Sequence, residues 1–161
     1  MIQRPALLLP FLILAACAGG GGGGSKGGGG PKACTCDAPG CPTVSFAGNI
    51  QPIFNRSCAT NSQCHGTNGA QGLDLTTGNS IPDTVGVKST QQPKLFLVKA
   101  GSADDSYLYR KIINAPGISG IIMPQGCPGN PIGGAVCLSS EEISAIEQWI
   151  TECATATPSL P

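Results

Sequence analysis

Two thiols and an imidazole lie close together in the segment Cys58-Ala-Thr-Asn-Ser-Gln-Cys64-His65. A thiolate can form a covalent bond with carbon or with another sulfur, and a neutral imidazole is the most common metal ligand in proteins. His65 is the sole histidine of the chain. The segment therefore predicts either the covalent attachment of a group beside a metal ligand or a disulfide between Cys58 and Cys64.

A possible second metal ligand follows further along the chain. Met123 is the only methionine besides the initiator, and it stands in Ile121-Ile122-Met123-Pro124, 58 residues after His65. A c-type haem requires two thiols for thioether bonds, an imidazole on one axial position of the iron and often a thioether sulfur on the other. We therefore expect one covalent haem c, bound by Cys58 and Cys64, with His65 and Met123 as iron ligands.

Other interpretations of the same residues exist. A methionine next to two isoleucines is usually part of a core, and a lone histidine is often an ordinary exposed residue. Cys58 and Cys64 could also be joined to each other in an exported protein. The conjunction of an adjacent Cys-His pair, a following glycine, a preceding amphipathic helix and a Met-Pro pair favours haem. A further alternative keeps haem but leaves Met123 off the iron, which opens a position for a small gas or peroxide.

The elements that position these residues are predicted to be helices joined by long loops. Apolar residues at helical spacing predict a first helix from Phe46 to about Arg56, which leads directly into Cys58. Pro52 removes a backbone donor from this helix, so a kink or a restart is expected there. A middle helix is predicted from about Asp104 to Ile113, with Ser102, Asp104 or Asp105 as its cap.

The last helix has the clearest signals. Ser139 and Glu142 form a capping box, and Leu138 with Ile143 forms a hydrophobic staple. Apolar residues then recur at helical spacing up to about Cys153. The segment from Lys94 to Lys99 alternates like a strand, but no other stretch does. These patterns predict a small all-α domain with long loops.

Several stretches together resemble the cytochrome c family, in the order found in single-haem domains of exported bacterial lipoproteins. The resemblance covers about residues 44 to 153. It is carried by Phe46 through Cys58, Cys64-His65-Gly66, Gly72-Leu-Asp-Leu75, Gly101 through Arg110, Met123-Pro124, Leu138 through Ile143, and Gln148-Trp149-Ile150.

The resemblance implies three to five helices around one covalently held haem and a role in electron transfer. It implies that Cys58 and Cys64 form the thioether bonds, that His65 is the proximal ligand and that Met123 is the distal ligand. It also implies that the first and last helices cross, with Phe46 or Ile50 packed against Trp149 or Ile150. We further expect the ring to be buried among Phe46, Phe54, Leu108 and Trp149.

The chain departs from the family in the spacer between the two cysteines, which has five residues, Ala59 to Gln63, instead of two. His65 must stay beside the second cysteine, so the three extra residues are expected to bulge out as an exposed polar loop. The attachment machinery reads the motif in an unfolded chain. A variant in which only Cys64 is linked is therefore the alternative to double attachment.

Six further cysteines are predicted to form three disulfides, for which fifteen pairings exist. Cys127 with Cys137 is the favoured pair, because it closes a loop of about 10 residues after Met123 and would stabilise the fold by about 2 to 3 kcal/mol. Cys153 would then pair with one of Cys34, Cys36 and Cys41. The rival, a metal site at these last three cysteines, lacks a fourth ligand nearby.

The start of the chain predicts export and a lipid anchor. Residues 1–16 combine Arg4 with an apolar run too short to span a bilayer, as in a signal peptide. Leu14-Ala15-Ala16-Cys17 resembles a lipobox with Cys17 as the acylated residue, and an ordinary secretory signal is the alternative. Ala18 favours the outer membrane, with the protein facing the periplasm or the exterior. Residues 17–42 are predicted to comprise the lipidated Cys17, a glycine-rich tether and a segment that contains Cys34, Cys36 and Cys41. A cytochrome c-like domain at 43–153 and a tail at 154–161 are expected to follow.

Composition narrows the class of function. The formal net charge is zero and no basic stripe occurs, so nucleic acid is not an expected partner. Aromatic residues make up 4% of the chain, and a small exported domain this poor in large side chains commonly needs disulfides, a metal or a cofactor. With both axial positions filled, we expect an electron carrier with redox partner proteins, free or as a subunit of a redox enzyme. The alternative is a haem-free, disulfide-bonded surface lipoprotein with a binding or structural role.

Overall fold

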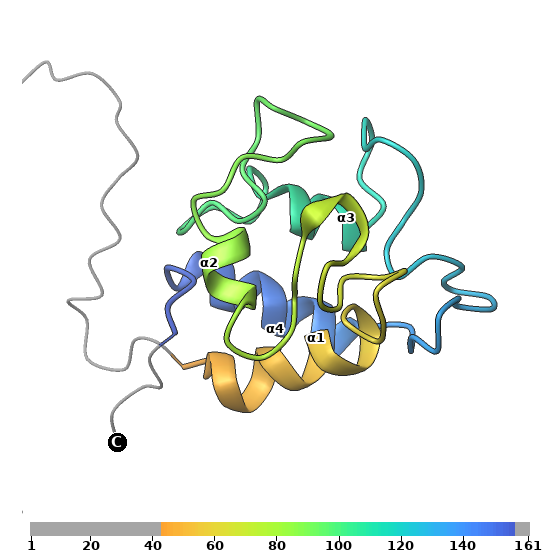
Figure 1. The fold of residues 1–161 in the computed structure, drawn as a ribbon. Coiled ribbons are helices and arrows are strands. Elements are labelled where there is room, and N and C mark those ends of the chain that lie inside the picture. The colour runs from red at the N-terminus through yellow and green to blue at the C-terminus, as the bar shows by residue number, and fades with distance from the viewer. Residues whose placement is uncertain (1–42, 157–161) are drawn as a thin grey trace, which may run out of the picture. The chain divides into compact units, whose positions relative to one another are not determined.

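The computed structural model describes residues 43–156, and these form a mostly helical domain without a β-sheet (Figure 1). The predicted signal peptide, Cys17, the tether and Cys34, Cys36 and Cys41 lie outside the described residues. The elements in chain order are the π-helix η1 (Phe46–Ile50), α1 (Gln51–Ser57), the 3-10 helix η2 (Ala70–Gly72), α2 (Ser80–Thr84), α3 (Tyr107–Ile112) and α4 (Ser140–Thr151). The predicted all-α class is therefore confirmed.

The predicted restart in the first helix is also confirmed. Hydrogen bonding changes from the π pattern of η1 to the α pattern of α1 at Gln51, one residue before Pro52. Pro52 thus stands in the first turn of α1, where a missing N–H costs little because it would have no partner within the helix. Ser45 caps η1, since its hydroxyl accepts a hydrogen bond from Gly48 N at 3.1 Å.

Helix α4 begins with the predicted capping box. Glu142 N donates to Ser139 Oγ at 3.3 Å, and Ser139 N donates to Glu142 Oε2 at 3.0 Å. The helix ends at Thr151, slightly earlier than predicted, because Cys153 and Ala154 adopt positive φ values of 82° and 50°. Residues at such φ values cannot continue a right-handed helix.

Three predictions between the first and last helices were wrong. Helix α3 begins at Tyr107 with Ser106 as its N-cap. Ser102 and Asp105 do not cap it, because they belong to a preceding turn. In this turn Ser102 Oγ donates to the Asp105 carboxylate, and Ser106 Oγ donates to Ser102 O at 2.7 Å. The segment 94–99 forms isolated bridges, such as Val98 with Val85, and no continuous strand. The short helices η2 and α2 lie in a region predicted to be loop.

The core joins the first and last helices. Phe46 packs against Trp149 with ring centroids 5.1 Å apart, and Phe54 meets both rings edge-on at 6.1 and 6.2 Å. The predicted contact between these helices is confirmed. The branched side chains that fill the space around the three rings are Ile50, Ile146 and Ile150, which are fully buried.

A polar clamp also connects the two ends of the domain. Glu152 follows α4 and accepts hydrogen bonds from Thr43 N at 2.8 Å and from Val44 N at 3.1 Å. This clamp connects the residues just before η1 to the residue just after α4. None of the helices within residues 43–156 combines the length and the apolar character needed to cross a bilayer.

Candidate functional site

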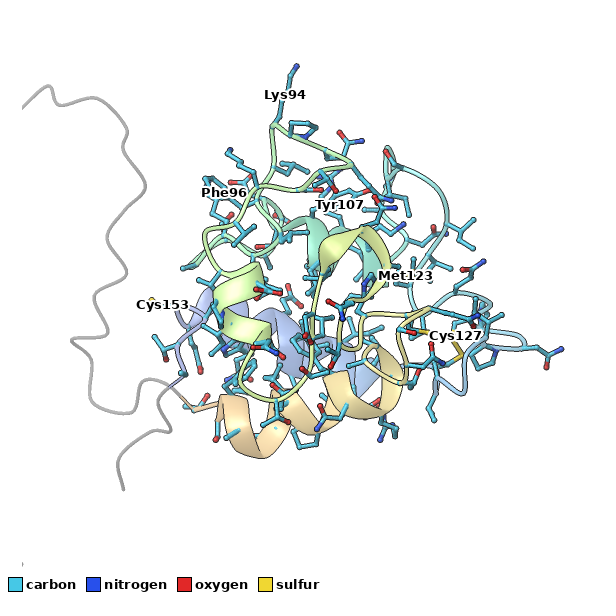
Figure 2. All side chains as sticks on the ribbon, viewed as in Figure 1. Lys94, Phe96, Tyr107, Met123, Cys127 and Cys153 are labelled. Atoms are coloured by element: carbon cyan, nitrogen blue, oxygen red, sulfur yellow. A yellow bond between two sulfur atoms is a disulfide. The ribbon has the colours of Figure 1, made fainter. Side chains whose placement is uncertain are left out.

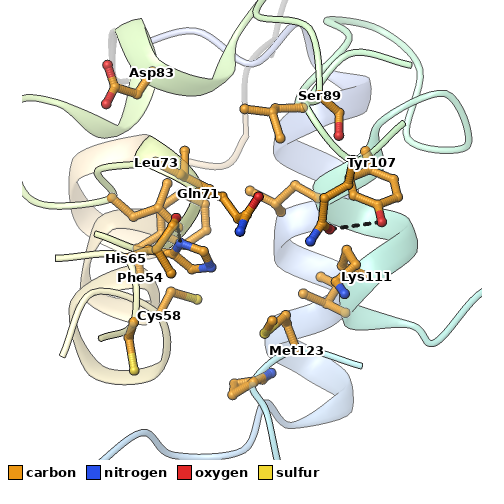
Figure 3. Close-up of a pocket in the computed structure, with 18 of the residues that line it drawn as sticks. Phe54, Cys58, His65, Gln71, Leu73, Asp83, Ser89, Tyr107, Lys111 and Met123 are labelled. Atoms are coloured by element: carbon orange, nitrogen blue, oxygen red, sulfur yellow. Dashed lines mark hydrogen bonds between the residues drawn. The ribbon is translucent and has the colours of Figure 1, made fainter. Parts of the chain in front are cut away.

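The four residues predicted to bind haem line one cavity of about 330 Å³. Figure 3 shows His65 on one wall and Met123 on the opposite wall, with the space between them open. The wall with His65 also carries Cys58 and Cys64 and consists of α1 and the segment that follows it. The wall with Met123 consists of α3 and the long loop before α4. The fold therefore brings together residues from distant parts of the chain.

The imidazole of His65 is held by its Nδ1 atom. Nδ1–H donates to Ala70 O at 3.2 Å, and the loop that supplies this carbonyl is closed by Ala70 N donating to Cys64 O at 2.6 Å. Gly69 allows this close approach, because a Cβ there would lie 2.6 Å from Gly66 O. A metal-binding histidine usually donates its other ring N–H in this way. The bond leaves Nε2 of His65 available as a ligand atom.

The electrostatic environment favours the metal-binding form of His65. Burial lowers the pKa of the imidazole and has the largest effect. The hydrogen bond to Ala70 O raises the pKa by less, and the ammonium of Lys111 lowers it by a still smaller amount. The net shift is downward, so the ring is neutral over a wider pH range than a free histidine. Only the neutral ring offers a lone pair to a metal.

Cys58 and Cys64 lie on the same wall and are not joined by a disulfide. Cys58 caps α1, and its carbonyl accepts a hydrogen bond from His65 N at 2.9 Å. Burial, with a smaller effect of Cys64, raises the pKa of the Cys58 thiol to about 12. Cys58 is therefore a protonated thiol at neutral pH.

The spacer between the two cysteines differs from the prediction. Only Ser62 and Gln63 are exposed, whereas Ala59, Thr60 and Asn61 are half-buried. The extra residues do not bulge out as a loose loop, because hydrogen bonds fold them into a turn against the rest of the domain.

Met123 is held in place by α3. Met123 N donates to Lys111 O at 3.0 Å. Lys111 is a buried residue with 7% of its surface exposed, and its ammonium donates to Ser119 O at 2.9 Å and to Ile121 O at 2.5 Å. These bonds hold the loop just before Met123. The predicted disulfide Cys127–Cys137 is confirmed and closes the loop just after Met123 (Figure 2). Sequence reasoning did not identify Lys111, because nothing in its pattern distinguishes it from an exposed lysine.

The remaining lining is largely apolar. Of the residues expected around a ring, Phe54 and Leu108 line the cavity, but Phe46 and Trp149 do not. That expectation was wrong for the last two because they pack against each other between η1 and α4. Ile146 is the residue through which α4 reaches the cavity. The other apolar residues of the lining include Leu73, Leu75, Val87, Leu97, Ile112, Ile132 and Ala135.

One buried polar group at the cavity lacks a partner within residues 43–156. Ser57 lines the cavity at 2% exposure, and its hydroxyl makes no hydrogen bond there. Buried hydroxyls are nearly always hydrogen-bonded in folded proteins. A bound group with an acceptor atom would satisfy this one. The thiols, the available imidazole nitrogen, the opposed thioether and this hydroxyl all fit a haem.

A bare metal ion has less support. Among residues 43–156 there is no group of three or more His, Cys, Asp and Glu side chains that could hold an ion. A haem iron differs, because the porphyrin supplies four ligands and the protein only one or two.

The sequence matches no protein-family model and no curated protein. Among solved structures, the domain is similar to hydrazine synthase of Kuenenia stuttgartiensis, with 23% sequence identity and a TM-score of 0.43. The alignment covers 69% of this chain but only 16% of that chain.

Proposed function

We propose that this chain is a c-type cytochrome that carries one haem and transfers electrons. The observation that carries the proposal is the placement of His65 and Met123 on opposite walls of one cavity, with Cys58 and Cys64 beside His65. The cavity volume of about 330 Å³ lies at the lower end of the range for cofactor sites, about 300 to 1,000 Å³. Among the described residues, these are the sole histidine and the sole methionine.

In this proposal each residue has a defined task. His65 would bind the iron through Nε2 while Ala70 O holds its ring, and Met123 would fill the opposite position. Cys58 and Cys64 would form thioether bonds, with attachment at Cys64 alone as the alternative. The bound group supplies one-electron iron chemistry. The largely apolar lining would shield the bound group from water, which would disfavour the charged ferric state and raise the reduction potential.

With both axial positions filled, the chain would exchange electrons with protein partners and would not bind a substrate at the iron. We further propose that Cys17 is lipidated after removal of residues 1–16 and that the glycine-rich segment, Gly19 to Gly30, confines the domain to the cell envelope. If a glycine-rich segment of 12 residues behaves as a random coil, its root-mean-square span would be about 17 to 21 Å, which would leave room to reach membrane-bound partners.

The test is expression of the full chain in a bacterial host competent for cytochrome c maturation, followed by denaturing electrophoresis and haem staining. A stained band is expected, because a covalent haem survives denaturation. A colourless band with Cys58 and Cys64 joined to each other would contradict the proposal and favour the haem-free lipoprotein.

The ligand assignment has its own test. The variant Met123→Ala should lose the near-infrared band that reports sulfur bound to ferric iron, because no other described methionine can replace it. The matched control is Ile121→Ala, two residues away and half-exposed at 50%, which should keep the band. A wild-type spectrum of five-coordinate haem would refute the role of Met123 and would favour the binding of a small gas or peroxide.

A further inference from the structure

The five-residue spacer is folded around a single residue, Asn61. Asn61 Oδ1 accepts hydrogen bonds from Gln63 N at 2.9 Å and from Cys64 N at 3.1 Å. The backbone oxygen of Asn61 accepts from Cys64 N at 3.1 Å and from Gly66 N at 2.9 Å. Asn61 therefore satisfies the amides on both sides of the Cys64-His65 pair.

The same side chain reaches across the fold. Asn61 Nδ2 donates to Gly133 O at 2.9 Å, and Gly133 belongs to the loop closed by the disulfide, residues 127–137, which we call the disulfide loop. The two surfaces are in close contact, because a Cβ on Gly133 would lie 2.6 Å from Cys64 Sγ and 3.1 Å from Asn61 Nδ2. Gly133 also has a φ of +66°, which favours glycine.

We infer that Asn61 is a positioning residue that folds the long spacer into a rigid turn, presents Cys64 and His65 to the cavity, and connects this wall to the disulfide loop after Met123. The inference rests on the proposed function in that Cys64 and His65 would hold the haem. The inference explains why the spacer can be three residues longer than usual, because Asn61 folds the longer segment into a turn. A flexible segment of this length would otherwise have to be ordered when the haem binds, at a cost in entropy.

The chemistry of the amide explains why asparagine suits this position. Its oxygen accepts two hydrogen bonds and its nitrogen donates one, and both are used. An aspartate would keep the acceptor and lose the donor, and its charge would face the carbonyl of Gly133. The substitutions Asn61→Asp and Asn61→Ala therefore separate the two tasks.

The experiment uses the full chain produced without haem and compares the wild type with Asn61→Asp, Asn61→Ala and the control Ser62→Ala. Ser62 is the exposed spacer neighbour of Asn61. The first readout is hydrogen exchange of the Gln63 and Cys64 amides, which donate to the Asn61 side chain. The second readout is the rate at which Cys64 reacts with a maleimide, assigned by peptide mapping because other thiols are present.

In Asn61→Ala we expect exchange at Gln63 and Cys64 to be about tenfold faster, because both amides lose the acceptor oxygen of the side chain. Asn61→Asp should restore the protection of these amides. Both variants should label Cys64 several times faster than the wild type, because the disulfide loop no longer covers its sulfur. Ser62→Ala should change neither readout.

Two results would overturn the inference. One is an Asn61→Ala chain that matches Ser62→Ala in both readouts. The other is an Asn61→Asp chain that labels Cys64 at the wild-type rate, and this variant decides the matter if Asn61→Ala does not fold. Because neither readout needs haem, a failure of the proposed function appears separately, as an absence of haem staining in the wild type.

Discussion

At the scale of single residues, neighbouring hydrogen bonds decide what each polar group can do. His65 Nδ1 is occupied by Ala70 O, so its free atom is Nε2, on the other side of the ring. Ser57 and Ser80 are two buried serines that differ in whether the hydroxyl has a hydrogen-bond partner. Both are almost fully buried, but Ser80 Oγ lies 2.8 Å from Gln51 Oε1 and from Leu75 O, whereas Ser57 Oγ lacks a partner among the described residues.

The two serines give a matched prediction. In the haem-free chain, Ser57→Ala should leave the free energy of unfolding unchanged or raise it by up to about 1 kcal/mol, because it removes an unsatisfied buried hydroxyl. Ser80→Ala should lower the same quantity by about 1 to 2 kcal/mol, because it breaks hydrogen bonds and leaves their partners unpaired. Urea denaturation measures both. Equal losses in the two variants would show that the Ser57 hydroxyl is satisfied in the free chain.

At the scale of secondary-structure elements, the ends of the first and last helices are tied by polar groups. Glu152 stands at the C-terminus of α4, where the helix dipole disfavours a negative charge. The hydrogen bonds that it accepts from Thr43 and Val44 offset this effect and order the start of η1. The aromatic contact between Phe46 and Trp149 depends on the same alignment.

The clamp predicts a pH dependence of stability. Burial raises the pKa of Glu152, but hydrogen bonds from Thr43, Gln148 and the Val44 backbone outweigh it, so the net pKa is lowered from its usual range. The carboxylate therefore stabilises the fold above the unfolded pKa of about 4.3, and this stabilisation is lost as the pH falls through the lower folded pKa.

Melting temperatures of the wild type and of Glu152→Gln, measured between pH 7 and pH 3, test this. The wild type should melt at the higher temperature at pH 7, and the difference should shrink as the solution becomes acidic. A difference that stays constant across this range would show that the charge of Glu152 contributes nothing.

At the scale of the whole molecule, a small core coexists with a cavity and long loops. The core lies between the first and last helices, while the cavity lies between α1 with its following turn on one side and α3 with its following loop on the other (Figure 1, Figure 3). The segment from Ile113 to Ser139 contains no helix or strand and consists of loop. The disulfide, Lys111 and the Asn61 side chain together hold this region in place.

The disulfide is expected to be the strongest of these restraints. Replacing Cys127 and Cys137 by serine should lower the free energy of unfolding by about 2 to 3 kcal/mol, because a loop of this length gains conformational entropy in the unfolded chain. Denaturant titration of the oxidised wild type and the double variant measures the loss. A loss below about 0.5 kcal/mol would contradict the expectation.

How much of this protein could be predicted depended on the range of the interactions involved. The last helix was predicted almost to the residue because its capping box and apolar repeat are local signals. The start of the middle helix was not predicted correctly. Ser102 and Asp105 bind each other in a turn that is also hydrogen-bonded to Lys99, and no local sequence pattern indicates these bonds. The disulfide was predicted because the two cysteines flank a short loop.

The sequence by itself determined the helical class, the candidate ligands and the restart at Pro52, because residue type and local spacing encode these properties. Only the tertiary structure decided that His65 faces Met123 across a cavity, that Trp149 belongs to the core and not to the cavity, and that the spacer folds onto Gly133. Each of these depends on contacts between residues more than 50 positions apart. Such contacts depend on how the whole chain packs, and no short stretch of sequence specifies them.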